Sequence, residues 1–204
     1  MRVAAGCFVC FERGTRGGGA AGDHGWAAAV LLVDGKLTEV AVVRGLAPVG
    51  YEPGLLALRE GLLLEAAVRG LATTPEVLLV DATGRDHPRR AGLALHLGAR
   101  LSLPTVGITA RPLLAQGVWP ADAPGATSPL KIGDEIVGDW LRTRRGVRPL
   151  AVHAAWRTDP EVAVAVVLAV TREWRAPEPL RQARRAAREA RSRDASGSGG
   201  DHEA

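Results

Sequence analysis

The segment Glu76–Gly98, which reads EVLLVDATGRDHPRRAGLALHLG, decides how this chain folds. Its apolar run Val77–Val80 is short and is bounded by polar residues, which predicts a buried β-strand. Asp81 ends the run, and the carboxyl end of a buried strand is where open α/β sheets bind their ligands. The segment therefore predicts a carboxylate at a ligand-binding edge, although a solvated turn with incidental charges remains the alternative.

A polar turn and a helix are expected after this strand. Pro88 suits the first turn of a helix, because its missing N–H would be unpaired there in any case. We expect the helix to run from Arg89 to about Leu97 and to end near Gly98. The strand–turn–helix unit then presents several charged or titratable side chains together: Asp81, Asp86, His87, Arg89 and Arg90.

The chain before this unit predicts an antiparallel meander of three strands. Residues 2–11 are apolar enough for a central strand, and residues 26–33 and 37–44 are two further apolar runs. Asp34-Gly35 stands between the last two runs, and this dipeptide is a strong hairpin signal. The Gly-rich segment 12–25 matches no phosphate-binding pattern, so we interpret it as a hairpin connection.

The remaining pattern predicts an α/β domain with a mixed sheet flanked by helices. Residues 54–69 have helical periodicity, with Leu55, Leu58, Leu62 and Ala66 on one face. Strands and helices alternate through residues 77–108, an order typical of parallel strands joined by helices. Later segments are expected as follows: a loop over 113–128, a strand pair over 130–141 and 146–153, a well-buried helix over 160–171 and an Arg-rich helix over 179–192.

Length and composition favour a single globular domain. The chain has 204 residues, 47% hydrophobic and 24% charged, and a net charge of +4. We expect one domain over residues 1–191 and a disordered polar tail over 192–204. Cys7 and Cys10 form a CxxC without a second ligand pair, which indicates buried thiols more than a metal or redox site. No apolar run could span a membrane and no secretory signal is evident, so we expect a cytoplasmic monomer.

The opening segment also resembles the signature VDGxGxxHPRxxGxAxHxG of the endonuclease V family. Four more blocks occur in the order of the family, and the chain is identified as a divergent member on their strength. They are residues 50–61 (like PYIPGxLxFREG), 104–113 (like PTIGVAKxxL), 141–147 (like LRTxxGVxP) and 175–181 onward (like RxPEPxRxAH). The resemblance implies a ribonuclease H-like fold, in agreement with the order of strands and helices.

The resemblance further implies a metal-dependent phosphodiester hydrolase. Glu60 and Asp81 match two of the family's metal-site acids, and Mg²⁺ or Mn²⁺ is the implied cofactor, since hard cations take oxygen ligands. His87 is implied to act near the scissile phosphate as a third catalytic residue. From the residues alone, Glu60 could instead pair with Arg59, and His87 could cap the start of a helix.

Three positions depart from the family's patterns. Phe8 stands where the first strand, roughly AGVDVSY, has an aspartate; Ala110 replaces a lysine; and Trp156 replaces a histidine. We interpret these as three correlated losses in one region, which would weaken metal binding and leave the cleavage activity weak or lost. The polar residues considered as replacements are Asp86, Asp23, His24, Glu12 and His153.

The residues implied to recognise nucleic acid match the family's patterns more closely than the metal-site residues do. Tyr51 and Pro53 match a wedge that separates the strands at a deaminated base, and other matching positions are implied to bind the base or the backbone. The full set is Tyr51, Pro53, Leu56, Gly84, Arg89, Arg90, Gly107 and Leu113. The implied partner is DNA or RNA with deaminated purines such as inosine. The open alternatives are a family member that binds without cutting and a protein-interaction module.

Overall fold

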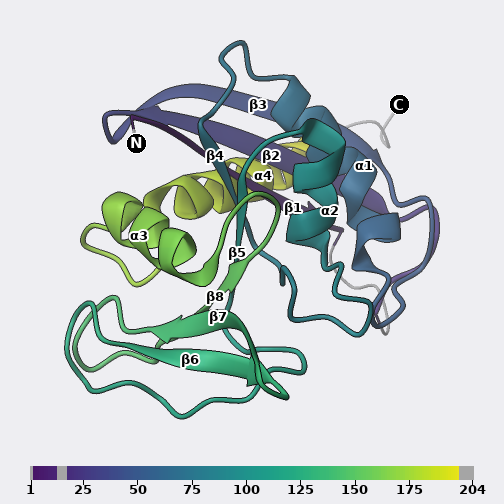
Figure 1. The fold of residues 1–204 in the computed structure, drawn as a ribbon. Coiled ribbons are helices and arrows are strands. Elements are labelled where there is room, and N and C mark those ends of the chain that lie inside the picture. The colour runs from purple at the N-terminus through teal and green to yellow at the C-terminus, as the bar shows by residue number, and fades with distance from the viewer. Residues whose placement is uncertain (1, 13–17, 198–204) are drawn as a thin grey trace, which may run out of the picture.

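The computed structural model describes residues 2–12 and 18–197, which form an eight-stranded sheet with helices on both faces (Figure 1). The strands are β1 (Val3–Phe11), β2 (His24–Val33), β3 (Lys36–Leu46), β4 (Val77–Val80), β5 (Thr105–Thr109), β6 (Thr127–Ile132), β7 (Glu135–Leu141) and β8 (Leu150–Ala154). The helices are α1 (Leu56–Arg69), α2 (Leu93–Leu101), α3 (Pro160–Val170) and α4 (Glu178–Gly197).

The sheet is mixed, as the sequence predicts. Its strand order is β3-β2-β1-β4-β5-β8-β7-β6; β1, β4 and β5 run parallel, and the other neighbouring pairs are antiparallel. The predicted meander is β1-β2-β3, and its second turn has positive φ at both Asp34 (49°) and Gly35 (75°). A two-residue hairpin with this geometry matches the twist of its strands. The α/β mixed-sheet prediction is confirmed.

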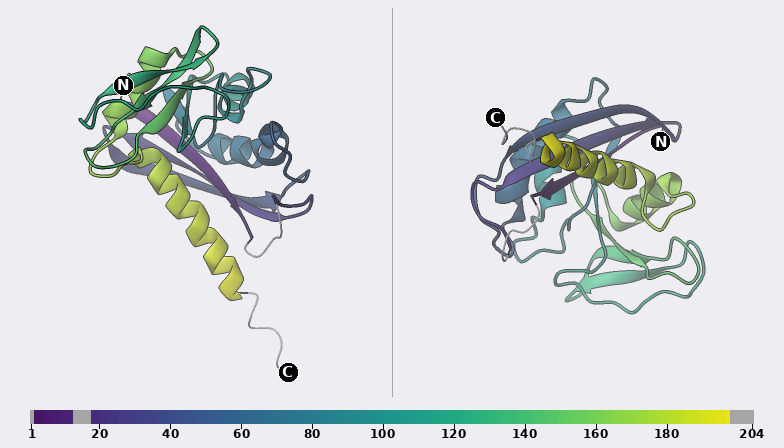
Figure 2. Two further views of the ribbon diagram at one scale, coloured as in Figure 1. Left: turned by 90° about the horizontal axis from the view of Figure 1, so that it is seen from below. Right: turned by 180° about the vertical axis from the view of Figure 1, so that it is seen from behind.

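The side chains of β1 alternate between two cores. Ala5, Cys7 and Val9 pack in the core beneath α1 and α2, whereas Cys10 packs with small residues of α4 on the opposite face. Figure 2 shows α4 crossing the face of the sheet opposite α1. Because strand side chains alternate, residues three apart point to opposite faces. Cys7 and Cys10 are buried free thiols, as expected, and cannot together hold a metal or form a disulfide.

The helix after Asp81 begins later than predicted. α2 starts at Leu93 rather than Arg89, and Gly92 is its N-terminal cap residue in an extended conformation. Arg90 has a left-handed φ of 55°, which no residue of an α-helix adopts, and it keeps residues 85–92 in a turn. Pro88 therefore belongs to the turn and not to a first helical turn.

Two helices bury less of their apolar surface than the sequence indicated. Leu58 and Leu62, which share the apolar face identified in the sequence, are 53% and 62% exposed, and α1 packs through its neighbouring face. The buried residues of that face include Leu63, Leu64, Ala67 and Val68. Helix α3 buries only Ala163, Val167 and Val170, so the expectation of a well-buried helix is wrong. The strand expected over 130–141 belongs to two strands, β6 and β7, that form a hairpin.

The last helix is longer than predicted. Helix α4 continues to Gly197, so residues 192–197 are helical and not part of a disordered tail. The rest of the predicted tail, residues 198–204, and residues 13–17 of the Gly-rich segment lie outside the described residues. None of the helices in the described part of the chain combines the length and the apolar character needed to cross a membrane.

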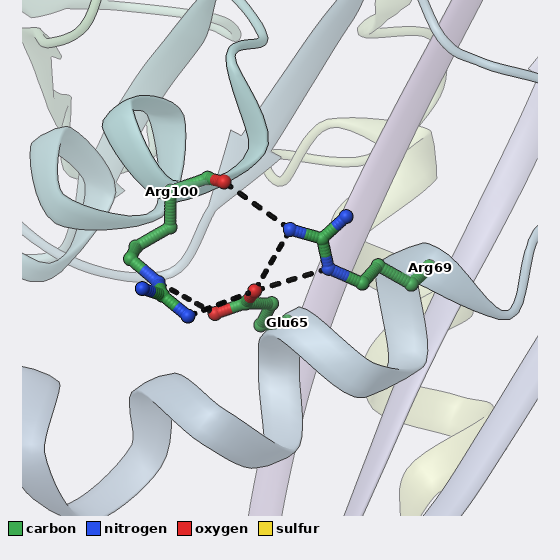
Figure 3. Close-up of polar contacts among 3 residues, drawn as sticks. All are labelled: Glu65, Arg69 and Arg100. Carbon is green, nitrogen blue, oxygen red and sulfur yellow. Dashed lines mark hydrogen bonds and ion pairs between the residues drawn. The ribbon is translucent and has the colours of Figure 1, made fainter.

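Glu65 joins α1 to α2 (Figure 3). Its carboxylate accepts hydrogen bonds from Arg69, one turn later in α1, and from Arg100 of α2, at 2.9–3.3 Å. Arg69 also donates to the main-chain carbonyl of Arg100 at 3.2 Å. The hydrogen bonds from Arg100 and then Arg69 hold the pKa of Glu65 below its usual value. This network fixes α1, which carries Glu60, against the helix that follows the Asp81 turn.

Candidate functional site

Glu60 and Asp81 meet at the carboxyl edge of the parallel strands. Both line a cavity of about 130 Å³ together with residues of β1, α1 and β4: Cys7, Phe8, Val9, Leu56, Leu64 and Val80. Cys7 pairs with Val80 in the β1–β4 ladder, so the next residues along, Phe8 and Asp81, lie beside each other. The structure therefore brings together the two acids singled out in the sequence and places Phe8 next to them.

Glu60 lies in a poorly solvated environment. Burial raises the pKa of Glu60 to about 7, against the opposing charge of Arg59 and with a further raising contribution from the charge of Asp81. The pKa of the neighbouring Cys7 thiol is also raised, chiefly by burial and then by the charges of Asp81 and Glu60. Near neutral pH the protonated form of Glu60 is thus well populated, and a cation that bound there would have to displace this proton.

Asp81 has a partner that the sequence reasoning missed. The guanidinium of Arg184, on α4, donates from Nη2 to Asp81 Oδ2 at 2.5 Å. A signal for this residue was present, since Arg184 stands where the pattern RxPEPxRxAH of the fifth block has its final histidine. Arg184 of α4 therefore reaches Asp81, so the basic helix is not only a solvated surface.

The residues present do not fit a divalent metal at this site. A phenyl ring at Phe8 offers no oxygen ligand where the resemblance implies a carboxylate, and Arg184 already binds an oxygen of Asp81. Nowhere in residues 2–12 and 18–197 do three or more His, Cys, Asp or Glu side chains gather as metal ligands would. Glu60 and Asp81 are the two carboxylates left for a cation of this kind, and Arg184 already holds one of them.

Asp86 has a structural role and is not a spare metal ligand. Its carboxylate is completely buried and accepts hydrogen bonds from the main-chain N–H groups of Leu113, Leu114 and Ala115 at 2.6–2.8 Å. Three donors of this kind hold a carboxylate in one place and use its lone pairs. Asp86 therefore fixes the segment that carries Leu113.

The other polar residues considered as replacements do not line the acid-pair cavity. Asp23 is engaged by Arg59 at 2.6 Å. His153 is buried in β8, lies 2.9 Å from Thr109 Oγ1 through Nε2, and burial lowers its pKa to about 4. Glu12 and His24 are exposed residues at the β1–β2 connection. None of the four supplies the missing carboxylate.

A second cavity of about 140 Å³ lies next to the acid pair. Leu56 lines both cavities and so forms part of the wall between them. The other lining residues come from residues 49–54, called the wedge segment, from α1, from the turn after β4, from the start of α2 and from the loop after β5: Tyr51, Gly54, Ala57, Ala82, Thr83, His87, Ala91, Leu93 and Leu113. This cavity gathers three of the predicted base-binding residues, Tyr51, Leu56 and Leu113, at one place.

His87 faces this second cavity and not the acid pair. Its Nδ1 accepts from the N–H of Arg89 at 3.2 Å, and its Nε2 lies 3.1 Å from the carbonyl oxygen of Gly54, to which it donates. The ring thereby ties the wedge segment to the turn after β4. Its predicted role near a phosphate stays a prediction, and its contacts in the structure are those of a positioning residue.

The remaining predicted recognition residues fall into two groups. Pro53 and Arg89 are exposed beside the cavity, Arg89 lies 3.3 Å from the carbonyl of Gly54, and Arg90 pairs with Glu135 at 3.1 Å. Gly84 and Gly107 do not line the cavity. A Cβ at Gly84 would lie 2.2 Å from the carbonyl oxygen of Ala154, and one at Gly107 would lie 2.4 Å from that of Ala82. These two glycines are needed for backbone packing.

The three replaced positions do not lie in one region, so that part of the sequence interpretation is wrong. Phe8 adjoins Asp81, and Ala110 follows β5 as an exposed residue at the same edge of the sheet. Trp156 exchanges hydrogen bonds with Thr105, which begins β5, at 2.9 and 3.0 Å. Parallel strands begin and end at opposite edges of a sheet, so Trp156 lies at the edge away from Asp81.

Comparison with known proteins agrees with this geometry. The sequence profile of endonuclease V matches residues 5–185. The chain belongs to the endonuclease V family. It is 41% identical over 167 residues to endonuclease V of Dehalococcoides mccartyi, covering 81% of this chain and 75% of that protein. It is 42% identical over 159 residues to the Streptomyces coelicolor protein, covering 77% and 68%.

Solved structures of the family have the same fold. The crystal structure of endonuclease V from Streptomyces avermitilis superposes with a TM-score of 0.86 at 34% identity, covering 95% of this chain and 82% of that one. The Bacillus subtilis structure gives 0.87 at 27% identity, covering 97% and 84%. The Ciona intestinalis enzyme in complex with a 24mer DNA containing an inosine gives 0.78 at 18% identity, covering 94% and 87%. These neighbours confirm the ribonuclease H-like fold.

Proposed function

We propose that this protein recognises deaminated purines, inosine in particular, in DNA or RNA, and that its hydrolysis of a nearby phosphodiester bond is weak or absent. The observation that carries the proposal is the contrast between its two adjoining cavities. The cavity lined by Tyr51, Leu56, His87 and Leu113 is formed, whereas the acid pair beside it has Phe8 in place of a third carboxylate.

The shape of the second cavity supports binding of an extruded base. Its walls are mostly apolar, with Tyr51 at the rim, and an aromatic ring there can stack on a base or fill the space that an extruded base leaves. Exposed Arg89 and Pro53 border the cavity, and an arginine at this place can contact the phosphate backbone. A related fold, that of the Ciona intestinalis enzyme, is known in complex with inosine-containing DNA.

The acid pair supports weak or absent cleavage. Metal-assisted phosphodiester hydrolysis depends on carboxylates that hold the cation against both the attacking and the leaving oxygen. Deleting one member of such a unit can lower the rate by a factor on the order of 10³ or more. Phe8 removes one such carboxylate, and among the residues that the structure describes Glu60 and Asp81 are the acids that line the cavity.

Fluorescence anisotropy with matched oligonucleotides tests the recognition. Four strands are needed, DNA and RNA, each with one inosine or with guanosine at that position, over a range of salt concentrations. We expect tighter binding to the inosine strands and an affinity that falls with salt, since phosphate contacts release counterions. Equal affinity for inosine and guanosine strands would contradict the proposal.

Variants connect the binding to the cavity. Tyr51→Ala should weaken inosine binding about tenfold, since stacking of one base contributes on the order of 1–3 kcal/mol. Trp174→Ala is the matched control, because Trp174 is similarly exposed and lines neither cavity.

A single-turnover nicking assay of the same strands with Mg²⁺ and with Mn²⁺ tests the proposal that cleavage is weak or absent. Rapid cleavage that Asp81→Ala abolishes would show that the reduced acid site still works.

A further inference from the structure

Arg184 contacts Asp81, one member of the acid pair. Its Nη2 lies 2.5 Å from Asp81 Oδ2, and the two side chains are only 36% and 30% exposed. The arginine reaches this position from α4, on the face of the sheet opposite α1, which carries Glu60 (Figure 2). A fixed positive charge of the protein therefore contacts a carboxylate that the family resemblance assigns to a metal.

Phe8 completes the surroundings of this guanidinium. The Arg184 guanidinium carbon lies 5.1 Å from the centre of the Phe8 ring, and that of Arg188 lies 5.7 Å from it. At such distances the negative face of an aromatic ring attracts a cation. A phenyl ring thus suits an organic cation here, whereas an aspartate in the same place would suit a metal ion.

The two departures from the family's patterns are in contact with each other. Phe8 stands in place of the aspartate of the first strand, and Arg184 stands in place of the last histidine of the fifth block. They are 176 residues apart in the sequence, yet the guanidinium of one lies over the ring of the other. Both changes disfavour binding of a metal cation, since one removes an oxygen ligand and the other adds a positive charge.

We propose that Arg184 takes the place of the divalent cation at Asp81, so that the site carries its own positive charge and binds neither Mg²⁺ nor Mn²⁺. A metal approaching Asp81 would meet the guanidinium that already binds its Oδ2 and would find no ligand at Phe8. It follows that nucleic acid binding needs no divalent cation, a consequence that rests on the function proposed above.

Mn²⁺ binding followed by electron paramagnetic resonance tests the proposal on the purified protein. We expect the spectrum of free Mn²⁺ to persist at millimolar protein for the wild type and for Arg185→Gln. Arg185 is the matched control, because it lies on the same helix but pairs with Glu189 at 2.6 Å and not with the acid pair. Mn²⁺ binding by the wild type, lost in Asp81→Asn, would overturn the proposal.

Two variants should create the binding that the wild type lacks. Arg184→Gln frees Asp81 and should bind Mn²⁺ measurably, and the double variant Phe8→Asp with Arg184→Gln should bind it more tightly. Arg184 is partly exposed, so the single variant is expected to fold even if the change at Phe8 disturbs β1, and a melting curve verifies folding. No gain of Mn²⁺ binding in folded Arg184→Gln would overturn the exclusion of metal by Arg184.

Oligonucleotide binding in EDTA and in Mg²⁺ separates the two proposals. We expect the same affinity of the wild type for an inosine strand in both buffers. Binding that requires Mg²⁺ would overturn the role of Arg184 while leaving inosine recognition intact. Failure to bind inosine strands in either buffer would contradict the proposed function, and the Mn²⁺ measurements would then decide the role of Arg184 alone.

Discussion

Arg59 and Asp23 form a buried ion pair beneath the segment that carries Tyr51, with Nη2 2.6 Å from Oδ2 and side chains 3% and 9% exposed. Arg59 also donates to the carbonyl oxygens of Ala20 at 2.7 Å and Val49 at 2.9 Å. One guanidinium on α1 thus holds both the end of the Gly-rich segment and the start of the wedge. The position of Tyr51 depends on a residue that does not line its cavity.

Asp23→Asn should lower both the melting temperature and the affinity for inosine strands. The hydrogen bond from Arg59 lowers the pKa of Asp23, so the carboxylate is charged at neutral pH and its loss leaves a buried guanidinium without its counter-charge. The wedge segment should then become mobile, and the inosine affinity should fall several-fold. Thermal melting and anisotropy measure the two effects. Glu189→Gln, which breaks an exposed ion pair of α4, should leave the melting temperature nearly unchanged.

Asp86→Asn should destabilise the protein by about 2–3 kcal/mol, since it turns an acceptor of three main-chain N–H groups into a group with its own donors. Urea unfolding measures the change. Asp122→Asn is the control, because Asp122 is half exposed in a neighbouring loop and should contribute less than about 1 kcal/mol. If the two variants lost equal stability, the three hydrogen bonds to Asp86 would not have the structural role assigned here.

Much of the sheet could be predicted from the sequence, because its signals are local. The Asp34-Gly35 turn specifies the β2–β3 hairpin by its own backbone preference, and the apolar run before Asp81 is too short for a helix. The start of α2 could not be predicted, since it depends on the left-handed conformation of Arg90. The exposed face of α1 was misjudged for a similar reason. Periodicity shows that Leu58 and Leu62 share a face, but not whether a neighbour covers it.

The acid pair could be predicted from the sequence, but the ion pair that Arg184 forms with Asp81 could not. Glu60 and Asp81 stand in blocks whose spacing implies their role, and strand order brings them together. The contact of Arg184 with Asp81 joins residues 103 positions apart, one on α4 and the other at the end of β4. No local pattern specifies such a contact. Likewise Gly84 and Gly107 occupy matching motif positions, yet only the close carbonyls of Ala154 and Ala82 show that they serve packing.

The Glu65 network predicts a measurable coupling between α1 and α2. Glu65→Gln and Arg100→Ala should each destabilise the protein, and the double variant should lose about 1 kcal/mol less than the sum of the two. The coupling is modest because the side chain of Arg100 is more than half exposed. Urea unfolding of the four proteins gives the interaction energy. Glu65→Gln with Arg44→Ala is the control pair, since Arg44 pairs with Asp194 elsewhere, and it should be additive.

Glu60 should make the stability fall as the pH rises. Burial raises its pKa from 4.5 to about 7, so between these values the folded state binds a proton that the unfolded state has released. Stability therefore contains a contribution that is complete below about pH 4.5 and is lost as the pH rises through about 7. Glu60→Gln removes this dependence because the amide does not titrate. The difference in unfolding free energy, variant minus wild type, should therefore increase between pH 4.5 and pH 8. The expected increase is up to about 3 kcal/mol.

The measurement is the difference in unfolding free energy between Glu60→Gln and the wild type, from urea unfolding at several pH values. Taking the difference cancels groups with the opposite dependence, among them His153, whose lowered pKa makes stability rise between about pH 4 and 6.5. A flat difference for Glu60→Gln would mean that folding does not raise the pKa of Glu60. Its carboxylate would then be fully available beside Asp81 at neutral pH, and only Phe8 and Arg184 would oppose a cation there.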